Sequence, residues 1–217
     1  MSGQTLHWYF DFVSPFAYLQ SCRLERRIDR RHTLVCHPVL LAAILEHWGQ
    51  LGPAEIEPKR ELTYRHVVWR AARDGFPLRM PPVHPFNPLP LLRLSIAAGG
   101  DFRAVRRIFD WVWCEGRLPD GAAGVEALAS ELNVTDWSQR VADAEIKDAL
   151  RRETAAAIAA GVFGVPTVIV AGRLFWGDDL TEMLFEFCDA PDMFDRPSYA
   201  SLAELPHGVR RRPTRSQ

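Results

Sequence analysis

The stretch that most constrains the fold of this chain is residues 8–20, which read WYFDFVSPFAYLQ. Its first half is aromatic and apolar apart from Asp11, which is typical of a buried strand and not of an amphipathic helix. Ser14 is a favoured N-cap and Pro15 a favoured first residue of a helix, so the strand should lead directly into a helix. The unpaired N–H groups at such a helix N-terminus favour a negative charge nearby, for example a thiolate.

The rest of the pattern predicts an α/β chain with a helical insertion. After the strand at Leu6–Phe12 and its helix, a second strand at Thr33–His37 completes β-α-β. Gly and Pro then separate six helical segments, expected at Leu40–Trp48, Lys59–Asp74, Pro88–Ala98, Phe102–Cys114, Val125–Leu132 and Trp137–Arg152. The last helix continues to Gly161. The end of the pattern is a strand at 164–170, a hairpin partner at Arg173–Trp176 and a final helix from Gly177 to Cys188.

This order of elements predicts how the chain divides into domains. Residues 1–38 and 153–190 form one discontinuous domain, and residues 39–152 form an all-helical domain inserted into it. The segment 191–217 is rich in Pro and Arg and is expected to be a flexible tail.

Composition and charge argue against several functions. The 26 Lys and Arg balance the 27 Asp and Glu to a formal net charge of -1, so neither nucleic acid nor a membrane is an expected partner. The four cysteines form no C-x-x-C and the N-terminus has no signal-like segment, which favours a reduced, cytoplasmic protein. His32 and His37 lie five apart on a strand and point to opposite faces, so no metal site is expected.

Four stretches together resemble a known family. They are YFDFVSPFAYL (9–19), HPFNPLPLLRL (84–94), VWCEG (112–116) and GVFGVPTVIVAGRLFWGDD (161–179). They are similar to 2-hydroxychromene-2-carboxylate isomerases and their kappa-class glutathione transferase relatives, in the DsbA-like branch of the thioredoxin superfamily. The resemblance covers about residues 6–188. It implies a thioredoxin-like fold with a helical domain inserted between the β-α-β and β-β-α halves.

The resemblance implies a glutathione site that begins at Ser14. This serine would lie beside the sulfur of glutathione and position it, so the reactive sulfur arrives with the cofactor. Val165 and Pro166 would form a cis peptide, and the Val165 backbone would pair with glutathione as an added strand. The alternatives are that Ser14 only caps its helix and that Pro166 only begins a strand.

The same resemblance places the other end of glutathione at the start of the final helix, at Trp176, Gly177, Asp178 and Asp179. Backbone N–H groups there would receive the γ-glutamyl carboxylate, and an acidic side chain would receive its amino group. An aspartate at this place is also a common N-cap. Relatives usually have arginine after this aspartate, whereas Leu180 stands here.

The substrate pocket is expected in the helical insertion. The isomerase pattern has a lysine and an Asn-Arg pair around a Gly-Pro, and this chain lacks them at Gly52-Pro53. Lys59 and Arg60 are therefore candidates for the missing cations. His84 falls where the family has a substrate-facing tyrosine, and Asn87 belongs to the shared PFN segment. Each of these residues can equally be an exposed loop or helix-start residue.

The function implied by the resemblance is a glutathione-dependent cis-trans isomerase that acts on a small aromatic or bicyclic carboxylate. Three alternatives stay open: a kappa-like glutathione transferase or peroxidase, a DsbA-like dithiol oxidoreductase, and a non-catalytic binding module. Ser14 and Ala17 replace both cysteines of a dithiol site, which disfavours the second. Relatives are commonly dimers, so a homodimer is possible.

Overall fold

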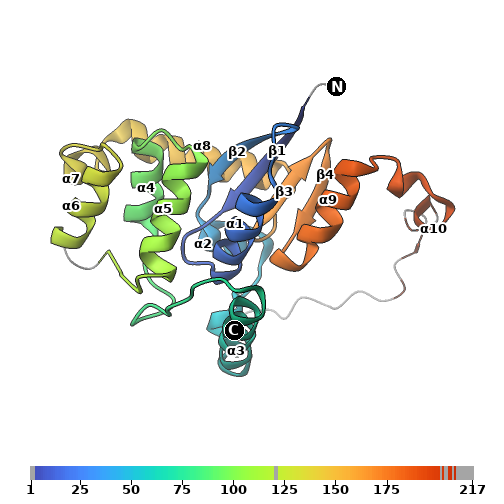
Figure 1. Ribbon diagram of the computed structural model, residues 1–217, viewed down its shortest axis with the longest axis horizontal. Helices are drawn as coiled ribbons and strands as arrows, with labels where there is room; N and C mark the ends of the chain where they lie inside the picture. Colours follow the sequence, from blue (N-terminus) through green and yellow to red (C-terminus); the bar gives the residue numbers. More distant parts are fainter. Residues whose placement is uncertain (1–2, 120–121, 201, 203–204, 207, 209–217) are drawn as a thin grey trace. The chain divides into compact units, whose positions relative to one another are not determined.

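A four-stranded mixed sheet organises the chain. The computed structural model describes residues 3–119, 122–200, 202, 205–206 and 208. Its strands are β1 (Gln4–Phe10), β2 (His32–Pro38), β3 (Thr167–Val170) and β4 (Arg173–Trp176). They lie in the order β2-β1-β3-β4, with β1 parallel to β2 and the other two pairs antiparallel (Figure 1).

Helices surround the sheet within the first of two compact units, residues 1–181. They are α1 (Pro15–Arg27), α2 (Leu41–Trp48), α3 (Glu57–Asp74), α4 (Leu89–Ala97), α5 (Phe102–Trp113), α6 (Ala122–Glu131), α7 (Trp137–Arg140) and α8 (Ala144–Ala159), with 3-10 turns η1 (Pro53–Glu55) and η2 (Asp178–Leu180). In Figure 1, α4 to α7 gather beside the sheet on its β2 side. The predicted order of β-α-β, helical insertion, and β-β is therefore present.

The second unit, residues 182–217, is described by itself. It holds most of α9 (Thr181–Asp189), the 3-10 turn η3 (Met193–Asp195) and the short helix α10 (Pro197–Ala200). The sequence predicted a flexible tail from residue 191. Part of that tail forms these two short elements, and residues 209–217 lie outside the described part of the chain.

Alternating residues of β1 face two different layers of the core. On one face Trp8 and Phe10 stack with ring centroids 4.6 Å apart, and Phe109 of α5 lies 5.9 and 5.7 Å from them. On the other face Tyr9 packs with apolar residues of α2 and α8, among them Ile44 and Ala157. Burial on both faces explains why the second half of β1, Trp8 to Phe10, is a continuous aromatic run without alternation.

Several boundaries differ from the prediction: β1 ends at Phe10 and not at Phe12, and the final helix begins as the 3-10 turn η2 before α9. The expected helix at 137–152 is divided into α7 and α8, because Asp143 adopts an extended conformation as the N-cap of α8, where aspartate is favoured. The strand expected from residue 164 begins at Thr167 instead.

Among the described residues, no helix combines the length and apolar character needed to cross a membrane.

Candidate active site

The turn between β1 and α1 presents Ser14 at a helix N-terminus. Ser14 is the N-cap of α1, and its Oγ accepts the N–H of Ala17 at 3.2 Å. A hydroxyl that accepts through a lone pair keeps its own hydrogen to donate elsewhere. The serine is 6% exposed, so such a donor would act in a largely dry environment.

The topology brings the start of β3 and the end of β4 to the same end of the sheet as this turn. Tyr9, near the end of β1, pairs with Thr167, and Thr167 pairs with Trp176. The Val165–Pro166 peptide, just before β3, is cis, as the sequence predicted. The N–H of Gly177 donates to the Pro166 carbonyl at 2.8 Å.

A buried amide on α1 holds the turn that follows β4. Gln20, 1% exposed, accepts the indole N–H of Trp8 at 2.8 Å through Oε1. Its Nε2 donates to the Gly177 carbonyl at 3.0 Å and to Thr181 Oγ1 at 3.2 Å. The helix that carries Ser14 therefore also fixes the Trp176–Asp179 turn.

The two aspartates of that turn have different environments. Asp178 is buried, with Arg23 Nε donating to Oδ1 at 2.9 Å and Arg70 forming an ion pair with Oδ2 at 2.8 Å. Burial raises the pKa of Asp178 above its ordinary value, and the two arginines oppose that rise. Asp179 is exposed. Only Asp179 therefore has a carboxylate that is accessible to a ligand amino group.

Asp11 is a buried carboxylate at the base of the serine turn. Its Oδ1 accepts the N–H of Val13 at 3.1 Å, and its Oδ2 accepts the N–H of Leu41 at 2.9 Å. Burial raises the pKa of Asp11 to about 7, although backbone N–H groups, first that of Leu41, act in the opposite direction. The sequence marked this residue as a polar exception in an apolar strand but assigned it no role.

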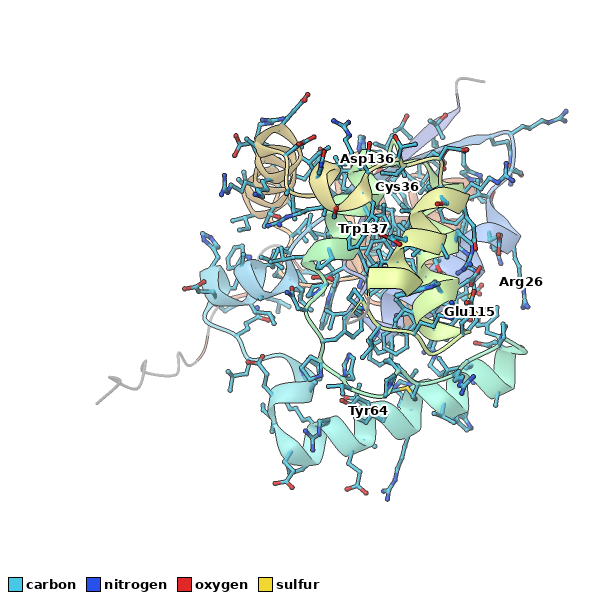
Figure 2. All side chains as sticks on the ribbon, turned by 90° about the vertical axis from the view of Figure 1, so that its left-hand side faces the viewer. Arg26, Cys36, Tyr64, Glu115, Asp136 and Trp137 are labelled. Atoms are coloured by element: carbon cyan, nitrogen blue, oxygen red, sulfur yellow. The ribbon has the colours of Figure 1, made fainter. Side chains whose placement is uncertain are left out.

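His84 is the substrate candidate that the structure brings to the serine turn. Its Nε2 lies 2.7 Å from the carbonyl of Val13, the residue before Ser14, and its Nδ1 lies 2.8 Å from the Tyr64 hydroxyl. Tyr64 projects from α3 toward the segment that carries His84 (Figure 2). Burial raises the pKa of Tyr64, and Arg60, one turn earlier on α3, acts in the opposite direction.

The other substrate candidates are placed less centrally. Lys59 and Arg60 are exposed in the first turn of α3, and only Arg60 is connected to the site, through its charge near Tyr64. Asn87 is exposed, and its Oδ1 accepts the N–H of Leu89 at 3.1 Å, which caps the start of α4. Tyr64, Gln20, Arg23 and Arg70 had no signal in the sequence, because each is connected to the site only through tertiary contacts.

Three of the protein's four thiols, those of Cys22, Cys36 and Cys114, lack the environment of a nucleophile. None of the four cysteines forms a disulfide. Burial raises the pKa of Cys36 and of Cys114 to about 12, and it also raises that of Cys22. These three thiols stay protonated at neutral pH.

Within the described residues, no group of three or more His, Cys, Asp or Glu side chains could hold a metal ion.

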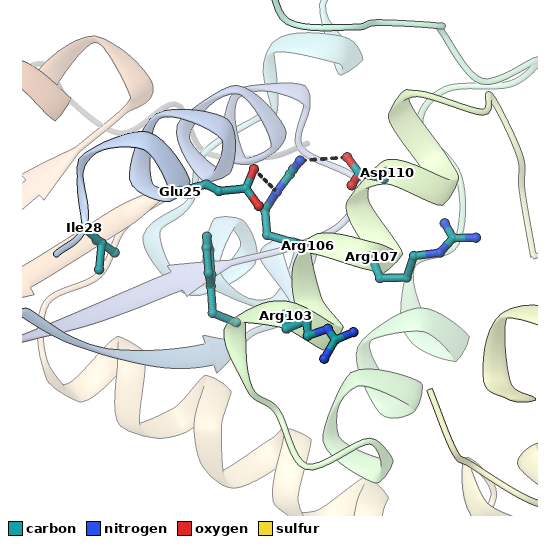
Figure 3. A pocket seen from close by; sticks show the side chains of 7 residues that line it. Glu25, Ile28, Arg103, Arg106, Arg107 and Asp110 are labelled. Atoms are coloured by element: carbon teal, nitrogen blue, oxygen red, sulfur yellow. Dashed lines mark hydrogen bonds and ion pairs between the residues drawn. The ribbon is translucent and has the colours of Figure 1, made fainter. Parts of the chain in front are cut away.

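A separate hollow of about 490 Å³ lies between the C-terminal end of α1 and α5 (Figure 3). Arg106 in this hollow lies 2.8 Å from the Asp110 carboxylate and 3.5 Å from that of Glu25, while Arg103 and Arg107 point away from these acids (Figure 3). The acids already neutralise the buried guanidinium. The hollow is therefore a poor anion site, and it lies at the opposite end of α1 from Ser14.

The fold and the serine turn define a thioredoxin-like protein in which a serine caps the helix that would otherwise carry a cysteine pair. The chain belongs to the family of DSBA-like thioredoxin domains, whose model matches residues 5–187. A 2-hydroxychromene-2-carboxylate isomerase from Pseudomonas putida is 33% identical over 189 residues, which are 82% of this chain and 90% of that protein.

Solved structures agree with this assignment of the fold. A structure of a 2-hydroxychromene-2-carboxylate isomerase matches with a TM-score of 0.77 at 24% identity, covering 88% of this chain and 97% of that one. The cytosolic disulfide reductase DsbM from Pseudomonas aeruginosa, solved with GSH, matches with a TM-score of 0.57 at 16% identity, covering 92% of this chain and 97% of that one. The predicted thioredoxin-like fold with inserted helices is therefore confirmed.

Proposed function

We propose that the protein is a glutathione-dependent isomerase of small aromatic or bicyclic carboxylates, of the 2-hydroxychromene-2-carboxylate type. The observation that carries the proposal is the position of Ser14, which caps α1 at the end of the sheet where β3 begins. The similarity to the Pseudomonas putida isomerase supports the reaction class. The solved DsbM complex with GSH supports the choice of cofactor on the same fold.

The residues at this end of the sheet fit glutathione by their donor and acceptor chemistry. Ser14 offers a hydroxyl hydrogen for a sulfur. Val165 lies just beyond the last β1–β3 ladder pair, Tyr9–Thr167, where an extended peptide can add as a strand. Asp179 offers an exposed carboxylate for an amino group, whereas the Asp178 carboxylate is occupied by Arg23 and Arg70.

Glutathione, when bound, would supply a thiol nucleophile for reversible addition to an electrophilic carbon of the substrate. The chain's own residues prepare that chemistry. The Ser14 hydroxyl would donate to the sulfur, and the partial positive charge at the N-terminus of α1 would favour its ionised form. The backbone at Val165 and the turn at Gly177 orient the tripeptide, which lowers the entropy cost of bringing the two reactants together.

Product analysis tests the reaction class. The protein is incubated with glutathione and 2-hydroxychromene-2-carboxylate, and the products are separated. The expected result is the trans isomer with the amount of free glutathione unchanged. A stable glutathione conjugate would overturn the isomerase proposal in favour of a transferase. Absence of both turnover and glutathione binding at millimolar concentration, with the protein folded, would indicate a binding module.

Ser14→Ala tests the role of the serine. Loss of a cap costs only about 1 kcal/mol of stability, so the fold should persist. Loss of a hydrogen bond to a charged sulfur costs roughly 1.5 to 3 kcal/mol, so the pKa of the bound thiol should rise by about one to two units. Thiolate absorbance of the glutathione complex against pH measures it. Ser138→Ala, on exposed α7, is the matched control. Coincident curves for wild type and Ser14→Ala would reduce Ser14 to a cap.

A further inference from the structure

The peptide unit between Val13 and Ser14 is held at both of its polar groups. The Ser14 N–H donates to the Asp11 carbonyl at 3.0 Å, which is a bond within the turn itself. The Val13 carbonyl lies 2.7 Å from Nε2 of His84, which comes from the helical insertion 71 residues later. A second insertion residue, Trp113, donates its indole N–H to the neighbouring Phe12 carbonyl at 3.0 Å. The insertion therefore fixes the backbone that leads into Ser14.

The partners of His84 determine its tautomer. A carbonyl oxygen only accepts, so Nε2 of His84 must carry a hydrogen and donate it to Val13. In the neutral imidazole Nδ1 then has only a lone pair, and the Tyr64 hydroxyl 2.8 Å away must donate to it. Burial lowers the pKa of His84, which favours this neutral form.

The contacts also define what happens when His84 is protonated. Nδ1 then becomes a donor to the Tyr64 oxygen. The Tyr64 O–H can turn to the His84 carbonyl, which lies 3.0 Å away. The Nε2–H bond to Val13 is present in both states, so only the direction of the Tyr64 link reverses.

We propose that Tyr64 and His84 are a positioning pair through which the helical insertion sets the direction of the Ser14 hydroxyl. The peptide plane that contains the Val13 carbonyl also contains the N–H and the Cα atom of Ser14, so an anchored carbonyl fixes the position from which the Ser14 side chain projects. Tyr64 acts on this carbonyl only through His84, by holding the imidazole in the donating tautomer. The assignment to catalysis rests on the proposed function, because the hydroxyl matters chemically only if a sulfur lies beside it.

Amide hydrogen exchange in the free protein tests the positioning itself. His84→Leu removes the donor to Val13 and should speed exchange of the Ser14 amide at least about fivefold, the factor that one hydrogen bond of ordinary strength provides. His84→Gln keeps a donor and an acceptor on one side chain and should restore the slow rate. Tyr64→Phe should give an intermediate rate. Unchanged Ser14 exchange in both His84→Leu and Tyr64→Phe would overturn the proposal.

Two controls separate positioning from general destabilisation. The Val168 amide, in the ladder between β1 and β3, should exchange at the wild-type rate in every variant. His47→Gln is the same substitution at an exposed position on α2, and it should leave the rate of hydrogen exchange of the Ser14 amide unchanged. Equal acceleration at Val168 and Ser14, or a fast Ser14 amide in His84→Gln, would mean that His84 only stabilises the fold.

Thiolate absorbance of the glutathione complex then connects the pair to the sulfur. His84→Leu should raise the pKa of the bound thiol in the same direction as Ser14→Ala, and His84→Gln should restore it. If Ser14→Ala changes the absorbance and His84→Leu does not, the positioning proposal is wrong and the proposed function stands. If neither changes it while Ser14 exchange responds as expected, the role proposed for Ser14 at the sulfur is wrong, and the pair holds the peptide without a role in catalysis.

Discussion

At the scale of single residues, Asp11 connects two segments that are 28 residues apart in the chain. It is fully buried, and its two oxygens accept N–H groups from the serine turn and from the start of α2. A buried carboxylate is costly when it is ionised, and this cost depends on pH. The folded-state pKa of Asp11, about 7, lies above its ordinary value of 3.8. The folded protein therefore binds a proton that the unfolded chain releases between these two values.

Asp11→Asn should change both the stability and its pH dependence. The amide keeps one acceptor but turns N–H groups toward the other backbone donor, which should cost about 1–3 kcal/mol. In the wild type, stabilisation by the bound proton is full below the unfolded pKa and is lost as pH rises toward about 7. The advantage of wild type over the variant should therefore be larger at pH 5 than at pH 8. Urea unfolding at the two pH values measures it, and an advantage that grows with pH would contradict this account.

At the scale of elements, α1 connects the two halves of the site. Its N-terminus carries Ser14, and one and a half turns later Gln20 reaches the turn after β4. A further turn along, Arg23 reaches Asp178 of that turn. Because these contacts are buried, the start of η2 is fixed relative to the serine by a single rigid helix.

Gln20→Met should loosen that turn while keeping the volume of the side chain. The Trp8 indole N–H and the Gly177 carbonyl would both lose their partner, and one buried group left unpaired costs about 1–3 kcal/mol. The expected loss of stability is roughly 2 to 4 kcal/mol, accompanied by weaker glutathione binding. Chemical denaturation and calorimetry measure the two effects. Gln139→Met, on exposed α7, is the control and should change neither. A loss of stability below about 1 kcal/mol would show that the amide is not a structural link.

Local patterns predicted most of the elements and one special peptide bond. Periodicity and turn residues predicted β1, α1 and the hairpin of β3 and β4, and a resemblance of short motifs predicted the cis peptide at Pro166. Partners far apart in sequence were not predictable in this way. Tyr64 and His84 are 20 residues apart, and Gln20 and Gly177 are 157 apart, so nothing in their neighbourhoods indicates the contact.

The break at 141–143 was missed for a related physical reason. Its sequence has neither Pro nor Gly: α7 ends with Val141 as its C-cap, and Asp143 leaves the helical conformation as the N-cap of α8. Aspartate is tolerated inside a helix as well as favoured at a cap, so its identity alone does not decide between them.

At the scale of the whole molecule, the sheet and the helical insertion share one core. Phe109 and Trp113 of α5 are fully buried, and Trp113 donates to the backbone that follows β1. Residues 1–181 accordingly form a single compact unit. A shared core of this kind favours one cooperative transition over separate unfolding of the insertion.

Two cysteines provide a direct test of this cooperativity. Cys36 lies on β2, in the sheet, and Cys114 lies at the C-terminal end of α5, in the insertion. In variants that keep only one of these thiols, labelling at increasing urea concentration should give coincident midpoints, because both are protected by the same core. A midpoint for Cys114 clearly below that for Cys36 would show that the insertion opens first. Far-UV circular dichroism of both variants provides the reference transition.

The sheet order has a consequence for synthesis on the ribosome. β1 can pair with β2 as soon as about forty residues have emerged, but its other edge is occupied by β3, whose residues begin at Thr167. During translation of the whole insertion, this edge of β1, whose second half is aromatic and buried in the folded protein, has no partner, and an open edge is a template for aggregation. The nascent chain therefore needs either shielding by a chaperone or early packing of its helices against β1. The proposed glutathione site, whose parts come from both ends of this interval, becomes complete only after Trp176 to Asp179 have been synthesised.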